Sequence, residues 1–108
     1  MAFGFPAYHE DEVSYKGVKA NDLRRCITEA LVELTWIADE DDDLWFGNTG
    51  MNLWSYGENI KIERHAGGRV TIRSECKMPT QCIDWGRNKR NVNLFFERLE
   101  DYVAEVRS

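Results

Sequence analysis

The sequence predicts an α+β fold, a two-layer sandwich in which two helices cover one face of an antiparallel four-stranded sheet. Two stretches repeat apolar residues at helical spacing, several others alternate apolar with polar residues, and their order is β-α-β-β-β-α. With 108 residues, 43% of them hydrophobic, the chain can bury one core. We therefore expect a single domain over residues 1–108, with residues 1–9 as an arm that packs down or frays.

The first strand is predicted at Glu12–Val18, where Val13 and Tyr15 alternate with polar residues. A helix follows, and Asn21 or Asp22 can cap the free N–H groups of its first turn. Its apolar residues recur at i, i+4, i+7, i+8 and i+11, which places them on one stripe facing the core: Leu23, Ile27, Ala30, Leu31 and Leu34.

An acidic run, Asp39–Asp43, comes after this helix. Asp39, Asp41 and Asp43 have the initial spacing of a calcium loop. The pattern then fails, because Leu44 stands where the glycine of the turn belongs. We interpret the run as a solvated turn between helix and strand.

Two hairpins are predicted next, because from Leu44 onwards apolar residues recur at every second position, as they do in strands. The first joins Leu44–Gly47 to Met51–Arg64 through a turn at Asn48–Gly50, and the second turns at Ala66–Gly68. Trp45 has the opposite parity to its two apolar neighbours. We therefore expect Trp45 on the open face of the sheet, where an exposed aromatic residue often marks an interface.

The last helix is predicted at about Asp84–Val106, from apolar residues at helical spacing. Traced backwards, its apolar stripe reaches Trp85, but Asn88 and Lys89 occupy the turn between, where apolar residues are expected. A buried polar residue needs hydrogen-bond partners. Asn88 could lock the Pro79–Ile83 loop to the helix, or it could contact a ligand, and the sequence leaves both interpretations open.

The corner between the last strand and the last helix, residues 79–90, is the candidate site. Arg87, Lys89 and Arg90 cluster in the first helical turns, where the helix dipole disfavours positive charge. A bound phosphate or carboxylate would offset this cost, and so would Asp84 as the N-cap. The candidate ligand-binding residues are Thr80, Gln81, Asp84, Trp85, Arg87, Asn88, Lys89 and Arg90.

Thiol chemistry is an alternative use of the same corner. Cys82 or Cys76 could be a reactive thiolate beside the helix start, with His65 as its base and Asp84 orienting that base. Two half-buried structural thiols are the simpler interpretation, because the sequence has no cysteine-enzyme signature. The C-x5-C spacing of the two cysteines is also wrong for a zinc knuckle. No catalytic residue, metal or cofactor is therefore expected.

Charge and composition disfavour several classes of protein. The net charge is −5, yet residues 61–90 carry eight Lys and Arg against three Asp and Glu. An acidic chain with one basic stretch disfavours general nucleic-acid binding but leaves room for a local anion site. No apolar stretch approaches the roughly 18 residues of a membrane helix, and no signal-peptide pattern is present. Three irregularly spaced cysteines favour reduced thiols and a cytoplasmic location.

Several short motifs, LWSYGENIKIE, SEC, PTQ and DWG-x-NKRNV, follow one another in the second half of the chain. Over about residues 10–100 the chain resembles a small uncharacterised bacterial domain family with a PTQ-x2-DWG-x-NK corner. Thr35 departs from that family, which tends to have glycine before Trp36. The resemblance implies the β-α-β-β-β-α fold and no activity. The matching positions are Trp54, Ser55, Gly57, Pro79, Thr80, Gln81, Asp84, Trp85, Gly86, Asn88 and Lys89.

These features favour a cytoplasmic, non-enzymatic binding or protein-interaction domain, with its site at the corner 79–90 and a small anion or a protein as its partner. The alternatives are a small enzyme that uses a corner thiol and an anion-binding domain for phosphate, nucleotide or lipid headgroup. The sequence leaves the ligand and the oligomeric state open. It also leaves open whether the corner is a site or a structural motif.

Overall fold

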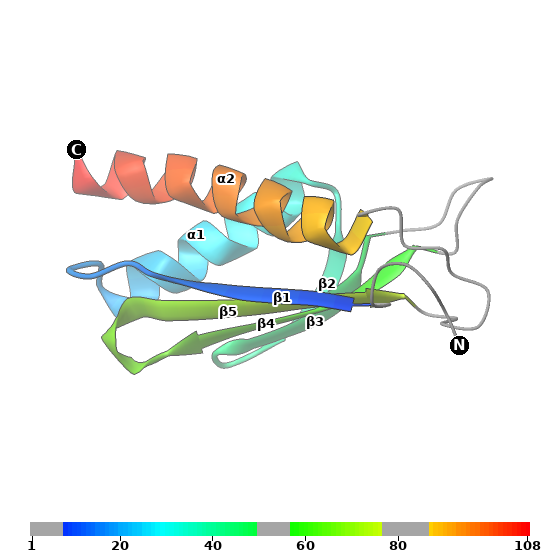
Figure 1. The fold of residues 1–108 in the computed structure, drawn as a ribbon. Helices are drawn as coiled ribbons and strands as arrows, with labels where there is room; N and C mark the ends of the chain where they lie inside the picture. Colours follow the sequence, from blue (N-terminus) through cyan, green and yellow to red (C-terminus); the bar gives the residue numbers. More distant parts are fainter. Residues whose placement is uncertain (1–7, 50–56, 77–86) are drawn as a thin grey trace.

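The computed structural model describes residues 8–49, 57–76 and 87–108. It has an α+β fold with one antiparallel sheet in the order β1-β5-β4-β3-β2, and both helices cover the same face of that sheet (Figure 1). The elements are β1 (Tyr8–Ser14), α1 (Ala20–Glu33), β2 (Ile37–Asp41), β3 (Leu44–Asn48), β4 (Glu58–His65), a short 3-10 turn (Ala66–Gly68), β5 (Arg69–Cys76) and α2 (Arg87–Arg107).

The described ranges already hold a sheet of five strands, so the predicted four-stranded sheet is wrong, and the additional strand is β2. Most of the acidic run forms this edge strand, which pairs antiparallel with β3, and Asp42 makes the turn at a positive φ of 54°. Asp and Asn tolerate this left-handed region better than most residues. The opposite edge strand, β1, carries a second acidic triplet, so that Glu10–Glu12 and Asp39–Asp41 lie on the two edges of the sheet.

A half-buried ion cluster holds the end of the β2–β3 hairpin against the rest of the domain. Asp43 Oδ1 accepts hydrogen bonds of 2.7 Å from Nε of both Arg24 and Arg64, and Asp43 Oδ2 accepts one of 2.9 Å from Arg64 Nη2. These bonds, from Arg64 first and Arg24 second, hold the pKa of the Asp43 carboxyl well below its usual range. The cluster is a structural contact among α1, the β2–β3 turn and β4.

Strand β1 lies earlier in the chain than predicted, at Tyr8–Ser14, so the first two of its residues belong to the expected arm. The two apolar residues that indicated this strand face inward, since Tyr15, directly after its end, is buried and Val13 packs against the core. The chain turns immediately after Tyr15, with Gly17 at a φ of 82°, which ends the strand well before Val18.

Helix α1 begins one residue earlier than the predicted caps. Its N-cap is Lys19, without a side-chain cap, and Asn21 instead accepts a hydrogen bond of 2.7 Å from Arg24. At the other end Thr35 N–H bonds to Val32 O and Trp36 N–H to Leu31 O, the paired bonds of a Schellman motif. Thr35 has a φ of 59° there. A positive φ favours glycine, so Thr35 stands at a position where the backbone is strained for a residue with a side chain.

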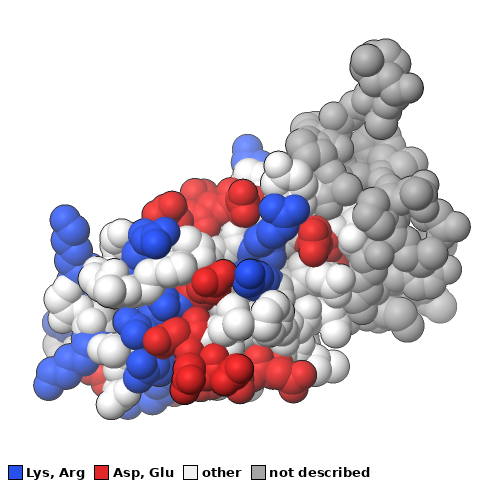
Figure 2. Space-filling view, turned by 90° about the horizontal axis from the view of Figure 1, so that it is seen from below, with Lys and Arg blue, Asp and Glu red and all other residues white. Residues whose placement is uncertain are grey.

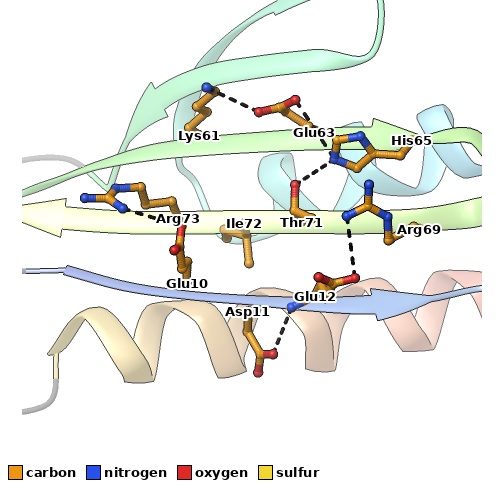
Figure 3. A pocket seen from close by; sticks show the side chains of 10 residues that line it. All are labelled: Glu10, Asp11, Glu12, Lys61, Glu63, His65, Arg69, Thr71, Ile72 and Arg73. Carbon is orange, nitrogen blue, oxygen red and sulfur yellow. Dashed lines mark hydrogen bonds and ion pairs between the residues drawn. The ribbon is translucent and has the colours of Figure 1, made fainter.

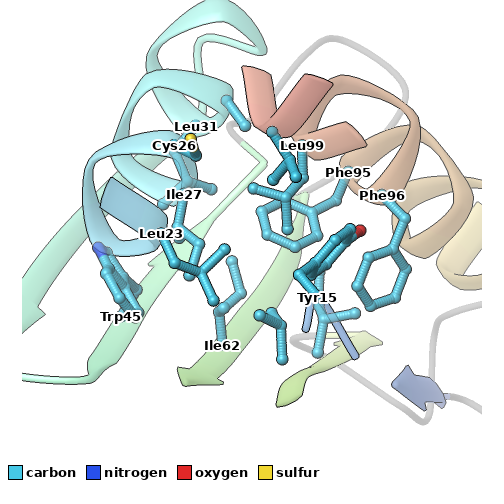
Figure 4. Packing of buried hydrophobic residues seen from close by; sticks show 14 of the residues in the cluster. Tyr15, Leu23, Cys26, Ile27, Leu31, Trp45, Ile62, Phe95, Phe96 and Leu99 are labelled. Carbon is cyan, nitrogen blue, oxygen red and sulfur yellow. The ribbon is translucent and has the colours of Figure 1, made fainter. Parts of the chain in front are cut away.

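Trp45 does not lie on the open face, so that prediction is wrong. It is 1% exposed, whereas Phe46 is 50% exposed. The register of β3 and β4 pairs Trp45 with Ile62, and both side chains point under helix α1 (Figure 4). The indole N–H of Trp45 donates to Thr28 Oγ1 on that helix at 3.3 Å. Leu44 and Phe46 therefore lie on the opposite, solvent-facing side of the strand.

The hairpin of β4 and β5 turns at Ala66–Gly68, as predicted. Gly68 has a φ of 80°, and an added Cβ atom would lie 2.3 Å from the carbonyl oxygen of Tyr15. That close approach lets Tyr15 N–H donate to Gly68 O at 2.8 Å, which ties β1 to the turn. The partner arm of the first predicted hairpin is described only from Gly57 onwards.

The core lies between the sheet and the two helices (Figure 4). The predicted apolar stripes of both helices face it, and α2 places Val92, Phe95, Leu99 and Val103 there with 2% exposure or less. Burying Phe95 or Leu99 contributes roughly 1.5–3 kcal/mol each. Among the described residues, no helix is long and apolar enough to cross a membrane. The predicted helix residues before Arg87 lie outside the described ranges.

Candidate functional site

A buried polar network lies under the start of α2, where hydrogen bonds join this helix to β4 and β5. Its central side chains are almost inaccessible to solvent: Glu58 is 3% exposed, and Ser74 and Asn88 are both 0% exposed. A carboxylate and an amide are costly to bury unless hydrogen bonds compensate for the lost water. We call Thr49, Glu58, Ser74, Asn88 and Asn91 the Glu58 network.

Hydrogen bonds join the members of the Glu58 network into one chain across three elements. Ser74 Oγ donates to Asn88 Oδ1 at 2.7 Å, which links β5 to α2. Asn91 Nδ2 donates to Glu58 Oε1 at 2.8 Å and to Ser74 Oγ at 3.2 Å, which links α2 to both strands. Thr49 Oγ1 donates to Glu58 Oε1 at 3.2 Å and accepts from Glu58 N–H at 3.0 Å.

Asn88 is the member of this network that the sequence predicted. It interrupts the apolar stripe and is buried and hydrogen-bonded, as a polar residue at that position requires. Its Nδ2 group also contacts Cys76 Sγ at 3.5 Å. These bonds attach the first turn of α2 to the end of β5, and the predicted partner loop, Pro79–Ile83, lies outside the described residues.

The remaining predicted site residues divide into two groups. Lys89 and Arg90 are exposed on the first turns of α2, and neither forms an ion pair with a residue that the structure describes. They line a shallow hollow of about 380 Å³ together with Asn93, Leu94 and Glu97. Arg87 is the first residue of α2. The predicted site residues that lie outside the described ranges are Thr80, Gln81, Asp84 and Trp85.

The predicted reduced state is wrong for Cys76, which is disulfide-bonded, whereas Cys26 is free. An odd number of cysteines prevents all of them from pairing, but it does not prevent two of them from doing so. A disulfide sulfur is no nucleophile, and burial raises the pKa of the Cys26 thiol. Cysteine usage therefore no longer supports a cytoplasmic location, which stays a prediction.

His65 is not placed to serve Cys76 as a catalytic base or as a second zinc ligand. Cys76 pairs with Glu58 at one end of the β4–β5 ladder, and His65 pairs with Arg69 at the other. Seven residues of strand separate them, roughly 23 Å. His65 Nε2 instead lies 3.0 Å from Thr71 Oγ1. Within the described ranges, no group of three or more His, Cys, Asp or Glu side chains could hold a metal ion.

Sequence reasoning missed Glu58, the charged member of the network. One signal was present, because Glu58 has the same parity as Ile60 and Ile62, which point into the core. A glutamate at an inward position of a strand is unusual enough to indicate a buried polar contact. Glu58, Ser74, Asn88 and Asn91 all fall within the quoted motifs, so these motifs meet in one network.

Comparison with known proteins gives little further information. The chain matches no protein-family model. A "Lysine-specific histone demethylase 1B homolog" of Caenorhabditis elegans is 47% identical to it over 36 residues, which are 33% of this chain and 4% of that protein. The chain thus spans a very small part of the demethylase homolog, and so short a stretch does not establish a shared family.

Proposed function

We propose that this chain is a non-enzymatic binding domain whose ligand contacts the corner 79–90, at the start of α2. The observation that carries the proposal is the Glu58 network, which fixes both ends of the connection between β5 and α2. Binding residues are commonly found on loops that a rigid scaffold positions. A buried network with its polar groups satisfied makes such a scaffold locally rigid.

The charge of the helix start indicates the kind of ligand. Lys89 and Arg90 stand in the first turns of α2 without an ion pair to a described residue. Positive charge at a helix N-terminus is unfavourable, and a negative ligand group would offset it. The proposed ligand is therefore a small anion or an acidic group on a partner protein.

A thiol enzyme is the competing function, and three observations weigh against it. The sulfur of Cys76 is already bonded, and Cys26 is buried in the core. His65, the predicted base, lies at the far end of the hairpin from Cys76. A role for Cys82 stays a prediction, because this residue lies outside the described ranges.

Amide chemical-shift titration of the isotope-labelled full chain tests the proposal, with sulfate, inorganic phosphate and a nucleotide as probes. Shifts should cluster on residues 80–94 and weaken with added salt, because exposed charge interactions are screened over about 8 Å at physiological ionic strength. Arg90→Gln should lower the affinity at least threefold. Arg98→Gln is the matched control, since Arg98 lies further along the same helix and is paired with Asp101 at 3.5 Å.

The proposal fails if the shifts spread evenly over the surface, or if Arg90→Gln and Arg98→Gln behave alike. A separate assay for thiol chemistry compares Cys82→Ser with the unmodified chain, both under reducing conditions, by reaction with an electrophilic probe. Rapid labelling that disappears in this variant, with an unchanged fold, would favour the enzyme.

A further inference from the structure

The two edge strands of the sheet, β1 and β2, differ in how their acidic side chains are paired. An edge strand exposes backbone N–H and C=O groups that no neighbouring strand takes up. Beyond each of these strands the structure describes no further strand. Figure 2 shows Lys and Arg side chains interleaved with acidic ones over the open face of the sheet, which lies opposite the helices. The pairing of these charges separates one edge from the other.

The acidic side chains of β1 already have partners. Glu12 Oε2 lies 3.6 Å from Arg69 Nη1. Glu10 Oε2 lies 3.4 Å from Arg73 Nη1. Asp11 Oδ1 accepts a hydrogen bond of 2.8 Å from the N–H group of Glu12. Figure 3 shows these contacts around a hollow of about 540 Å³ over β1, β5 and β4. This edge therefore has little unpaired charge to offer a partner.

Strand β2 differs, because its acidic side chains on the open face are unpaired. Asp39 and Asp41 form neither an ion pair nor a side-chain hydrogen bond with any residue that the structure describes. The register of β2 and β3 places Asp39 beside Phe46, on the face away from the helices. Glu40 points the other way and accepts a hydrogen bond of 3.0 Å from Thr28 Oγ1 on α1. Two unpaired carboxylates therefore stand at alternate positions of one open edge.

The cations of the neighbouring elements are bound elsewhere. The two arginines of the ion cluster are both paired with Asp43. Lys61 stands in the same row across the sheet as Asp39, but two strands away, roughly 10 Å between their backbones. Its Nζ is 3.2 Å from Glu63 Oε1. The charge of the β2 edge therefore stays negative.

Two large apolar side chains lie beside the unpaired carboxylates. Ile37 is 71% exposed and Phe46 is 50% exposed. Ile37 precedes Asp39 by two residues, so both point to the open face, and Phe46 is the β3 partner of Asp39. Exposed apolar residues that gather on one part of a surface often mark an interaction site. The edge of β2 thus combines open backbone groups, negative charge and exposed apolar area.

We propose that β2 is the docking edge for an extended basic segment of a partner protein, which pairs antiparallel with β2 and continues the sheet. The antiparallel direction follows the pairing of all the described strands. The segment places Lys or Arg opposite Asp41 and Asp39 and an apolar residue opposite Ile37. Read from its N-terminus, its pattern is basic–x–basic–x–apolar. Backbone hydrogen bonds hold such a segment, and its alternate side chains select it.

A protein segment fits this edge better than a metal ion does. Carboxylates two residues apart on a strand are separated by roughly 7 Å, too far to share one ion closely. Within the described ranges, no group of three or more His, Cys, Asp or Glu side chains could hold a metal ion. Strand β2 lies against β3 and α1, whereas the proposed function concerns the start of α2, so the inference goes beyond it.

The test titrates capped heptapeptides into the isotope-labelled full chain. The probe is threonine–lysine–threonine–lysine–threonine–valine–threonine, and the reversed sequence has the same charge but the wrong order for antiparallel pairing. The probe should shift the amides of Ile37–Asp41, and the reversed peptide should bind at least threefold more weakly. Asp39→Asn and Asp41→Asn should each lower the affinity at least threefold. Glu12→Gln is the matched control, because Glu12 lies on the other acidic edge and is paired with Arg69.

Spermidine, a cation without a peptide backbone, is the second arm of the experiment. Equal binding of spermidine at Ile37–Asp41 would show simple charge attraction and overturn the proposal of a protein segment. Equal affinity of the two peptides, equal loss in Glu12→Gln, or the absence of shifts at Ile37–Asp41 would also overturn it. Circular dichroism of each variant establishes that a loss of binding is not a loss of fold.

Discussion

The Glu58 network and the open face of the sheet use similar side chains in opposite surroundings. In the network, a glutamate meets neutral amides and hydroxyls at 0–3% exposure for its central members. On the open face, glutamates meet arginine and lysine in pairs that water can reach. Breaking a buried bond leaves a desolvated group unsatisfied, whereas water replaces an exposed partner. Burial, more than formal charge, therefore decides what these contacts contribute to stability.

The largest effect is expected from the network. Asn88→Ala removes the partner of Ser74 and should lower the free energy of unfolding by roughly 1–3 kcal/mol. Denaturant unfolding of both proteins measures the change in the midpoint. Asn93→Ala is the matched control, an exposed asparagine on the same helix, and should stay within about 0.5 kcal/mol. Equal unfolding midpoints for Asn88→Ala and the unmodified chain would show that the network does not stabilise the fold.

An intermediate effect is expected at the ion cluster of Asp43, whose side chain is 34% exposed against 13% for Arg64. Asp43→Asn should cost about 1–2 kcal/mol, less than the roughly 3–5 kcal/mol for breaking a fully buried pair, because water screens this one. Asp41→Asn, on the exposed edge strand, is the control.

The Asp43 contribution should depend on pH. Folding lowers the pKa of Asp43. The contribution of Asp43 to the free energy of unfolding is therefore complete above the pKa of the unfolded chain, about 3.9, and is lost as the pH falls below that value. Unfolding of the unmodified chain and of Asp43→Asn, measured between pH 7 and pH 3, should show a gap that narrows toward low pH. A gap that stays constant would contradict the assigned linkage.

The smallest effect is expected on the open face. Glu10→Gln removes the carboxylate 3.4 Å from Arg73 and should change the free energy of unfolding by less than about 0.5 kcal/mol. Thermal unfolding at low and at physiological salt measures it. A loss as large as that of Asn88→Ala would show that exposure does not separate the two regions.

The elements whose buried side repeats apolar residues at regular spacing were predictable from the sequence. Both helices and the β4–β5 hairpin were predicted because one side of each faces the core and repeats apolar residues. Strand β2 was not, because its charged residues are exposed and leave no alternation to detect. Trp45 was assigned to the wrong face, because its two neighbours, Leu44 and Phe46, are apolar as well and the pattern alone does not fix the register.

The candidate site was predictable only where a residue broke a pattern. Asn88 interrupts a long apolar stripe, so its burial and its need for partners could be inferred. Glu58 breaks a weaker pattern, the inward parity of Ile60 and Ile62 in the predicted strand, and its partner Asn91 lies in the polar turn beside the stripe. The pairing of β4 with β5 and the position of α2 decide which polar residues meet across the three elements. Neither can be predicted from a short stretch of sequence.

The two acidic edge strands have a consequence for how copies of this molecule meet one another. Edge strands expose unpaired backbone groups, and a second sheet can continue the ladder from them. Here any such continuation would bring Glu10–Glu12 or Asp39–Asp41 against an acidic triplet of another copy. For the strands that the structure describes, repulsion between the triplets therefore opposes continuation of the sheet from either edge at neutral pH.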